Sequence, residues 1–157
     1  MNVLIVSDTH GYTERIEELV SRLLKNPPDA VFFLGDGMRD TARLEGLSRN
    51  FYSVPGNCDW GFAEPQEKLV LFGGKRILML HGHTRGVKYG TERVEYLASE
   101  LKADAVIYGH THEREDRVSN GIHIFNPGSL GLPNRGAPSF GTLTVKDGII
   151  LFSHGEL

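Results

Sequence analysis

Short runs of apolar residues recur along the chain, and most of them end in a polar loop. Five such runs occupy residues 3–6, 30–34, 51–54, 77–80 and 105–108, and they are rich in branched and aromatic side chains. Continuous apolar runs of this length are typical of strands that are buried on both faces of a sheet. The pattern therefore predicts five buried strands.

Between the first two runs, apolar residues recur at helical spacing, and charged residues fill the opposite face. The apolar positions are Ile16, Leu19, Val20, Leu23 and Leu24. This periodicity predicts an amphipathic helix with Thr13 as its N-terminal cap, ended by Pro27 and Pro28. A shorter helix is predicted over residues 41–47, and a third begins at Thr91.

Three residue pairs that favour tight turns each lie between strand-like segments. They are Gly73-Gly74, Asn120-Gly121 and Asp147-Gly148. Such pairs adopt the positive φ values that β-hairpin turns require. Parallel βαβ units in the first half and hairpins in the second predict an α/β fold, a four-layer α/β/β/α sandwich of two mixed sheets flanked by helices.

Composition narrows the class of protein. The 157 residues show no compositional break, so we expect one domain spanning 1–157. The net charge of -3 provides no positive field to attract nucleic acid. No apolar run approaches the ~20 residues that span a bilayer, and no charged leader precedes the first strand, so we expect a cytoplasmic protein without a membrane partner. The single cysteine, Cys58, excludes an internal disulfide.

Residues of types that commonly bind metals follow all five apolar runs. They are Asp8, His10, Asp36, Asn57, His81, His110 and His112. Taken singly, each is more often a capping or hydrogen-bonding residue than a ligand. Together they lie where open α/β sheets bind ligands, beyond the carboxyl ends of strands. Seven ligands exceed the need of one tetrahedral ion, so the set predicts two cations that share a carboxylate.

The same residues form motifs that resemble a known family. Asp8-x-His10, Gly35-Asp36, Gly56-Asn57-Cys58-Asp59, His81-Gly82-His83 and Gly109-His110-x-His112 are similar, in order, to the motifs of the calcineurin-like metallophosphoesterase superfamily. The chain most resembles the small prokaryotic phosphodiesterase branch, in which Asn126-Pro127-Gly128-Ser129 also has a counterpart. The resemblance implies that Asp8, His10 and His112 bind one metal. It implies that Asn57, His81 and His110 bind the other, that Asp36 bridges them, and that His83 is not a ligand.

The expected chemistry is hydrolysis of a phosphate ester. Two divalent cations outweigh two carboxylates and a bridging hydroxide by one positive charge, which favours an anionic substrate. Such a pair of metals acidifies a shared water and holds the phosphate for in-line attack, so we expect a phosphodiesterase without a covalent intermediate. Oxygen and imidazole ligands suit Mn, Fe, Co, Ni and Zn, and we favour manganese.

Two residues are candidates for the acid that protonates the leaving group. Many members of the superfamily have a histidine where this chain has Cys58, and a thiol is a weak general acid. His83 is the other candidate. The structural alternatives are that Cys58 is a small buried side chain and that His83 orients His81. Three arginines, Arg39, Arg85 and Arg114, follow motif loops and are either substrate contacts or solvated side chains.

Other functions remain as alternatives. One is a catalytically silent binding scaffold, as is thought for the retromer subunit that resembles this family, although here every ligand position is filled. A phosphomonoesterase or a nuclease of the same superfamily is another, and a nuclease would need a basic groove. We expect a small phosphate ester as substrate and no nucleic acid. The sequence leaves the organic part of the substrate and the oligomeric state open.

Overall fold

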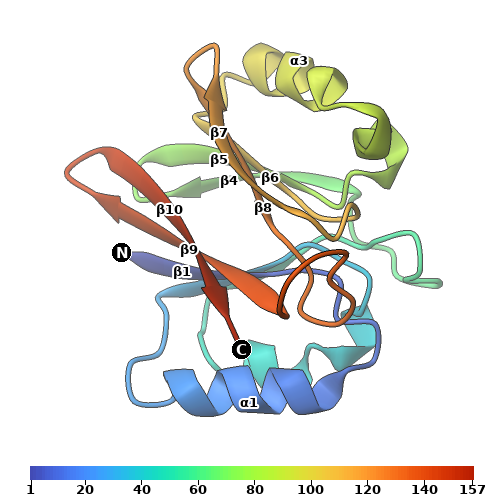
Figure 1. The fold of residues 1–157 in the computed structure, drawn as a ribbon. Coiled ribbons are helices and arrows are strands. Elements are labelled where there is room, and N and C mark those ends of the chain that lie inside the picture. Colours follow the sequence, from blue (N-terminus) through green and yellow to red (C-terminus); the bar gives the residue numbers. More distant parts are fainter.

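Two five-stranded sheets pack face to face in the computed structural model, which describes residues 1–157 (Figure 1). The first sheet has the order β10-β9-β1-β2-β3. Its strands are β1 (Asn2–Val6), β2 (Ala30–Phe33), β3 (Phe51–Ser53), β9 (Ser139–Lys146) and β10 (Ile149–Glu156). The strands β1, β2 and β3 are parallel, whereas β9 is antiparallel to both β1 and β10. The sheet is therefore mixed.

The second sheet is mixed in the same way and has the order β4-β5-β6-β8-β7. Its strands are β4 (Glu67–Phe72), β5 (Lys75–Leu80), β6 (Ala105–Tyr108), β7 (Arg114–Ser119) and β8 (Ile122–Pro127). The central strands β5, β6 and β8 are parallel, and the edge strands β4 and β7 run antiparallel to their neighbours. Long connections thus give parallel neighbours, and short hairpins give the edges.

Helices cover the outer faces of the two sheets. The α-helices are α1 (Thr13–Leu23), α2 (Ala42–Glu45) and α3 (Glu92–Glu100), and the 3-10 helices are η1 (Met38–Asp40), η2 (His83–Arg85) and η3 (Val87–Tyr89). Figure 1 shows α1 beneath the first sheet and α3 above the second. This arrangement confirms the predicted α/β/β/α sandwich. None of the helices is both long enough and apolar enough to cross a membrane.

The central strands alternate between two apolar layers, which explains why their sequences are apolar at every position. In β1, Val3 and Ile5 face the space between the sheets, whereas Leu4 packs in the cluster beneath α1. In β5, Ile77 joins the layer between the sheets and Leu78 joins the cluster beneath α3. Successive side chains of a strand point to opposite faces, so a strand covered on both faces has no polar positions.

The turns follow the sequence prediction, but one helix cap does not. The three hairpin pairs have positive φ at both residues, for example 49° at Asn120 and 77° at Gly121. The prediction that Thr13 caps the first helix is wrong, because α1 begins at Thr13 itself and Tyr12 precedes it without a side-chain cap. The predicted short helix exists as the four residues of α2, preceded by η1.

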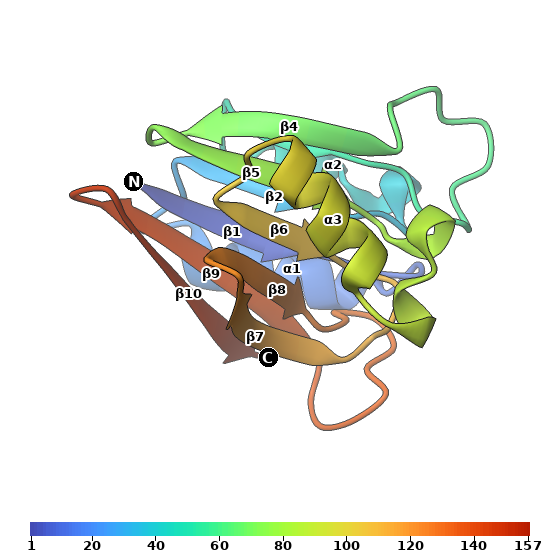
Figure 2. The same cartoon turned by 90° about the horizontal axis from the view of Figure 1, so that it is seen from above.

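Parallel strands bring their following loops to one end of the molecule. In Figure 2 the arrowheads of β1 and β6, which belong to different sheets, point to the same side. The loops after these two strands carry Asp8 and His110. The fold thereby gathers loops that are about a hundred residues apart in sequence.

Candidate metal centre

Five of the predicted site residues have left-handed backbone conformations. The φ values are 55° at Asp8, 46° at His10, 56° at Asp36, 68° at His110 and 57° at His112. Such values are uncommon outside glycine, and they persist only where the surrounding structure holds them. The loops therefore turn sharply as each strand ends, and this turn directs the side chains to the shared edge.

Two glycines allow the loops to approach closely. A Cβ on Gly56 would lie 2.1 Å from Asp36 Oδ1, and a Cβ on Gly109 would lie 2.0 Å from Ser7 Oγ. Any larger residue at either position would displace the neighbouring loop. These contacts give a physical reason for the glycines in the motifs.

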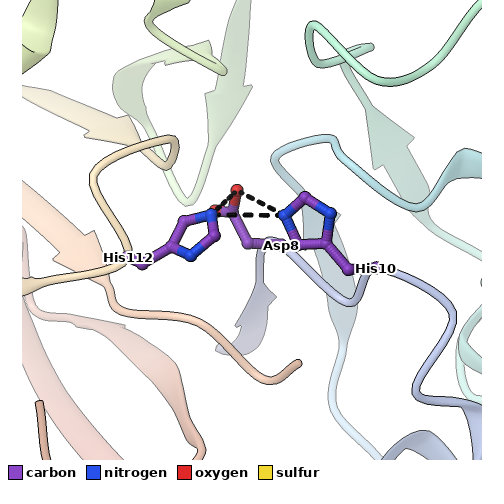
Figure 3. Close-up of side chains that lie close together, drawn as sticks. All are labelled: Asp8, His10 and His112. Carbon is purple, nitrogen blue, oxygen red and sulfur yellow. Dashed lines mark hydrogen bonds and ion pairs between the residues drawn. The ribbon is translucent and has the colours of Figure 1, made fainter. Parts of the chain in front are cut away.

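The first cluster consists of Asp8, His10 and His112 (Figure 3). Asp8 Oδ1 lies 3.1 Å from His112 Nε2 and 3.7 Å from His10 Nε2, and the two Nε2 atoms are 3.2 Å apart. Asp8 Oδ2 is held by Ser7 Oγ at 2.5 Å and by the His110 backbone N–H at 3.1 Å. Asp8 Oδ1, in contrast, is buried and accepts no hydrogen bond.

The proton positions in this cluster favour a cation. His112 Nδ1 lies 2.6 Å from the carbonyl oxygen of Leu132, which can only accept a hydrogen bond. The proton of the neutral ring is therefore on Nδ1, and the Nε2 lone pair faces Asp8 Oδ1. Two acceptors at this distance repel each other unless a positive charge lies between them. The residues present thus fit a metal ion.

The second cluster has the same design. It contains Asp36, His81 and His110, with Asn57 beside them. His81 Nδ1 donates to the Leu34 carbonyl oxygen at 2.6 Å, so the Nε2 atom of the neutral ring is again an acceptor. This atom lies 3.4 Å from Asp36 Oδ2 and 3.1 Å from Asn57 Oδ1. Three acceptor atoms therefore converge here as well.

Asp36 lies between the two clusters. Its Oδ2 is 3.7 Å from His10 Nε2 in the first cluster and 3.4 Å from His81 Nε2 in the second. Its Oδ1 is occupied by the Cys58 backbone N–H at 2.7 Å. One carboxylate oxygen therefore faces both groups of histidines. Six of the seven residues predicted as ligands fall into the groups Asp8-His10-His112 and Asp36-His81-His110, and Asn57 lies beside His81; His10 and Asp36 also form a group with Cys58.

The electrostatics are those of carboxylates surrounded by imidazoles. Burial alone would raise the pKa of Asp8, but contacts with His10 and His112 outweigh it and hold this pKa below its usual value. The same balance, with His81 as the partner, lowers the pKa of Asp36. Burial and the neighbouring His81 lower the pKa of His110 to about 4. The two carboxylates are thus anionic and His110 is neutral at neutral pH, which is the state in which these groups bind metals. The contact with Asp8 raises the pKa of His112, and Asp36 and Asp8 raise the pKa of His81 despite its burial, so a cation would compete with a proton at these two rings.

Sequence reasoning assigned no role to Asp59, which the structure places at the junction of two site loops. Its Oδ2 accepts hydrogen bonds from the backbone N–H groups of Asp36 at 2.7 Å and Gly56 at 2.8 Å. Its Oδ1 accepts from Gly37 at 2.9 Å and Met38 at 2.8 Å. One carboxylate therefore ties the loop after β2 to the loop after β3. The signal in the sequence was its place at the end of the Gly56-Asn57-Cys58-Asp59 motif.

Asn126 and Ser129 hold further site loops in place. Asn126 Nδ2 donates to the Gly109 carbonyl oxygen at 3.1 Å and to Thr111 Oγ1 at 3.0 Å. Ser129 Oγ donates to the Asp8 carbonyl oxygen at 2.8 Å. This loop, singled out by its resemblance, therefore supports the loops that carry the ligands.

The surroundings of Cys58 and His83 do not match the structural roles considered for them, a buried filler for Cys58 and orientation of His81 for His83. Cys58 is exposed, so the interpretation of a buried filler is wrong. Partial desolvation and the nearby Asp36 raise the pKa of its thiol. His83 stands 5.4 Å from His81, ring to ring, but Leu34 supplies the hydrogen bond that orients His81. His83 Nδ1 is buried without a hydrogen-bond partner, and burial, followed by the positive charge that His81 carries when protonated, lowers the pKa of His83.

The three candidate arginines differ in whether an acidic side chain already binds them. Arg85 is bonded to Glu67 through two nitrogens, at 2.5 and 3.0 Å, and Arg114 is paired with Glu156 at 2.5 Å. Arg39 has no such partner and lines a cavity of about 190 Å³ whose other walls include Cys58. Only Arg39 is therefore free to meet an anion beside the clusters.

Comparison with known proteins assigns the class. Residues 1–148 match the calcineurin-like phosphoesterase superfamily domain, and the chain belongs to this family. The resemblance inferred from the motifs is thereby confirmed. The chain is similar to the probable metallophosphoesterase YsnB of Bacillus subtilis (strain 168), with 36% identity over 148 residues that cover 94% of this chain and 86% of that protein.

A second relative agrees with this assignment, and a solved structure has the same fold. Phosphodiesterase YfcE of Escherichia coli (strain K12) is 27% identical over 168 residues, which cover 91% of this chain and 87% of that protein. The structure of wild-type Vps29 from Entamoeba histolytica, complexed with Zn²⁺, matches with a TM-score of 0.80 at 23% identity. The match covers 99% of this chain and 98% of that one. At this identity the likeness shows a shared fold.

Proposed function

We propose that the protein is a phosphodiesterase that requires two divalent metal ions and hydrolyses small phosphodiesters without a covalent phosphoenzyme. The observation that carries the proposal is the convergence of acceptor atoms described above, with Asp8 Oδ1 buried and unpaired. Asp8, His10 and His112 would bind one ion, and Asn57, His81 and His110 the other. Asp36 would bridge them, and manganese is our first choice of metal.

When bound, two such cations acidify a water molecule and neutralise charge on the phosphate oxygens. The protein's own part is to hold the ligands in fixed positions. Leu34 and Leu132 fix the proton on Nδ1 of their histidines, so that Nε2 is the free ligand atom. The second carboxylate oxygen of Asp8 and of Asp36 is held by hydrogen-bond donors, which leaves one oxygen of each for metal. No activated serine, cysteine or histidine nucleophile is needed.

Metal content and isotope transfer test the proposal. Elemental analysis after loading should give two ions per chain, and a reproducible value of one with full activity would count against the bridge. Asp36→Asn should damage activity and metal content more than Asn57→Ala, because a shared carboxylate supports both ions and an amide supports one. Equal effects of the two changes would weaken the assignment of Asp36.

Hydrolysis in ¹⁸O-labelled water should place one label on the phosphorus in a single turnover. A trapped phosphoryl adduct on the protein would refute direct attack by hydroxide. Full metal loading without hydrolysis of any phosphomonoester or phosphodiester would instead indicate a binding scaffold of the same fold. A clear preference for monoesters would place the chain among phosphomonoesterases.

A further inference from the structure

A second and larger pocket borders the candidate metal centre. Its volume is about 600 Å³, which lies within the range of small-molecule sites. The loop after β6 forms one wall through Thr111, the residue between His110 and His112. Lys88 in η3 and Thr91, which directly precedes α3, also line it. A molecule in this pocket would lie next to the histidines.

The lining of this pocket is mostly polar. Of its ten residues only Val87 and Tyr108 are hydrophobic, and Tyr108 donates its hydroxyl to the Glu115 carboxylate. An apolar group would leave these polar atoms without partners, whereas a hydroxylated group would engage them. The pocket therefore fits a hydrophilic ligand.

Most charged groups around the pocket are already neutralised. Arg114 pairs with Glu156 at 2.5 Å, and Glu115 pairs with Arg117 at 2.7 Å. The side chains of Lys88 and Glu113, in contrast, have no ion pair or hydrogen bond, and only the backbone of Glu113 is bonded, to Thr111 Oγ1. The groups available to a ligand are thus one ammonium and one carboxylate.

The free ammonium shares this pocket with a residue of the metal-site loop. Lys88 and Thr111 both line the pocket, and Thr111 lies between His110 and His112 in the chain. A phosphate held beside these two histidines would therefore face the pocket that Lys88 lines. Glu113 follows His112 in the chain and lines the same pocket.

We propose that this pocket binds the alcohol group of the ester and selects alcohols that carry a vicinal diol, such as a glyceryl group or a ribosyl group. Lys88 pairs with a phosphate oxygen, and Glu113 accepts hydrogen bonds from the two hydroxyls. A carboxylate has two acceptor oxygens, and acidic residues recognise the hydroxyls of ribose in this way. The inference rests on the proposed phosphodiesterase function and adds the substrate class.

Two synthetic diesters with the same nitrophenolate leaving group provide the test. One carries a 2,3-dihydroxypropyl group and the other a propyl group, so that they differ only in two hydroxyls. The metal-loaded wild type should favour the diol ester by about tenfold in kcat/KM, the scale of a hydrogen bond to a charged group. Glu113→Gln should reduce this preference to about twofold, because a neutral amide accepts hydrogen bonds from the hydroxyls more weakly than a carboxylate does.

Two further variants control the experiment. Asp147→Asn also removes one exposed carboxylate, but at the turn between β9 and β10, and it should keep the full preference. Lys88→Gln should weaken both esters equally, by about fivefold to tenfold, because both carry the phosphate. A selective effect of Lys88→Gln on the diol ester would contradict its assigned contact.

A binding measurement separates this inference from the proposed function. Calorimetric titration of the metal-loaded protein with glycerol 3-phosphate and with propyl phosphate needs no turnover. Glycerol 3-phosphate should bind about tenfold more tightly, and Glu113→Gln should reduce the difference to about twofold. Equal binding of the two ligands, or equal hydrolysis of the two diesters, would overturn the inference. Failure to hydrolyse either diester would count against the phosphodiesterase function, and the titration would still decide on the diol.

Discussion

Asp59 Oδ2 accepts a hydrogen bond from the backbone N–H of Asp36 at 2.7 Å, although the two residues belong to different loops. The same carboxylate accepts three further N–H groups, so it fixes the backbone of the residue that faces both clusters of candidate ligands. We therefore expect Asp59 to position Asp36 without contacting metal. This relationship leads to the first prediction.

Asp59→Asn should lower both stability and metal affinity. The amide nitrogen would face two backbone donors in place of an acceptor, and each unsatisfied donor costs about 1–3 kcal/mol. Denaturant unfolding and a metal titration measure the two effects. Asp116→Asn is the control, because that carboxylate is part of an exposed pair with His123 at the surface. Wild-type metal affinity in Asp59→Asn would show that the loops hold Asp36 without this carboxylate.

Cys58→His should speed the hydrolysis of esters with poor leaving groups. The raised pKa of Cys58 keeps its thiol protonated, and a thiol donates its proton weakly to a departing alkoxide. Aryl diesters should therefore be cut much faster than alkyl diesters by the wild type. An imidazole at this position should help alkyl esters by up to about 10²-fold and barely change nitrophenyl esters.

The measurement for Cys58 is kcat/KM over diesters of graded leaving-group pKa, at fixed metal occupancy. Cys58→Ser serves as the control and should match the wild type. A flat dependence in the wild type would indicate another acid. His83→Ala should then steepen the dependence if His83 supplies the proton, since its buried Nδ1 has no other partner.

Arg39→Gln should weaken the binding and turnover of anionic esters. Arg39 lines the same cavity as Cys58 and has no acidic partner, so its guanidinium can pair with phosphate oxygens. We expect a decrease in kcat/KM of about tenfold. Arg43→Gln is the control, because Arg43 pairs with Glu17 at 2.9 Å on the surface. Equal activities of the two variants would show that Arg39 is only solvated.

Stability should depend on Glu95 in a pH window below neutrality. Hydrogen bonds from Ser119 and Arg117 lower the pKa of Glu95 to about 2. A lowered pKa stabilises the folded state above the unfolded value of about 4.5, and this contribution is lost as pH falls towards 2. Glu95→Gln should therefore cost about 1–2 kcal/mol at pH 7, after allowance for screening. Unfolding curves of both proteins should converge near pH 2, and a gap independent of pH would contradict the linkage.

The layered architecture of the fold could be predicted from local patterns in the sequence. Apolar runs such as residues 3–6 and the Asn120-Gly121 pair report directly on strands and turns, because burial and positive φ restrict which residues fit. The prediction of Thr13 as the helix cap was wrong because local propensity does not decide where a loop joins a helix. The order of strands in the second sheet depends on packing between distant segments, and periodicity carries no information on it.

The sequence indicated the candidate ligand residues but not the neighbouring residues that hold them in place. Asp8 and His112 were found because ligand types follow buried strands in a recognisable series. The sequence did not indicate that Arg39 lacks an acidic partner or that Asp59 accepts four backbone hydrogen bonds. It also did not indicate the pocket that Lys88 lines. Each of these depends on which partners other segments provide, and a single sequence does not contain those distances.

The rings of His81 and His112 are held by hydrogen bonds from Nδ1, the nitrogen that faces away from the clusters. The acceptors are the backbone carbonyl oxygens of Leu34 and Leu132, respectively. The positions of these two Nε2 atoms are therefore set by the folded polypeptide. If metals bind as proposed, exchange of one divalent cation for another should leave these two rings in place. Which metal the protein carries would follow the concentrations of free ions around it, so its activity could vary with metal supply at constant protein level.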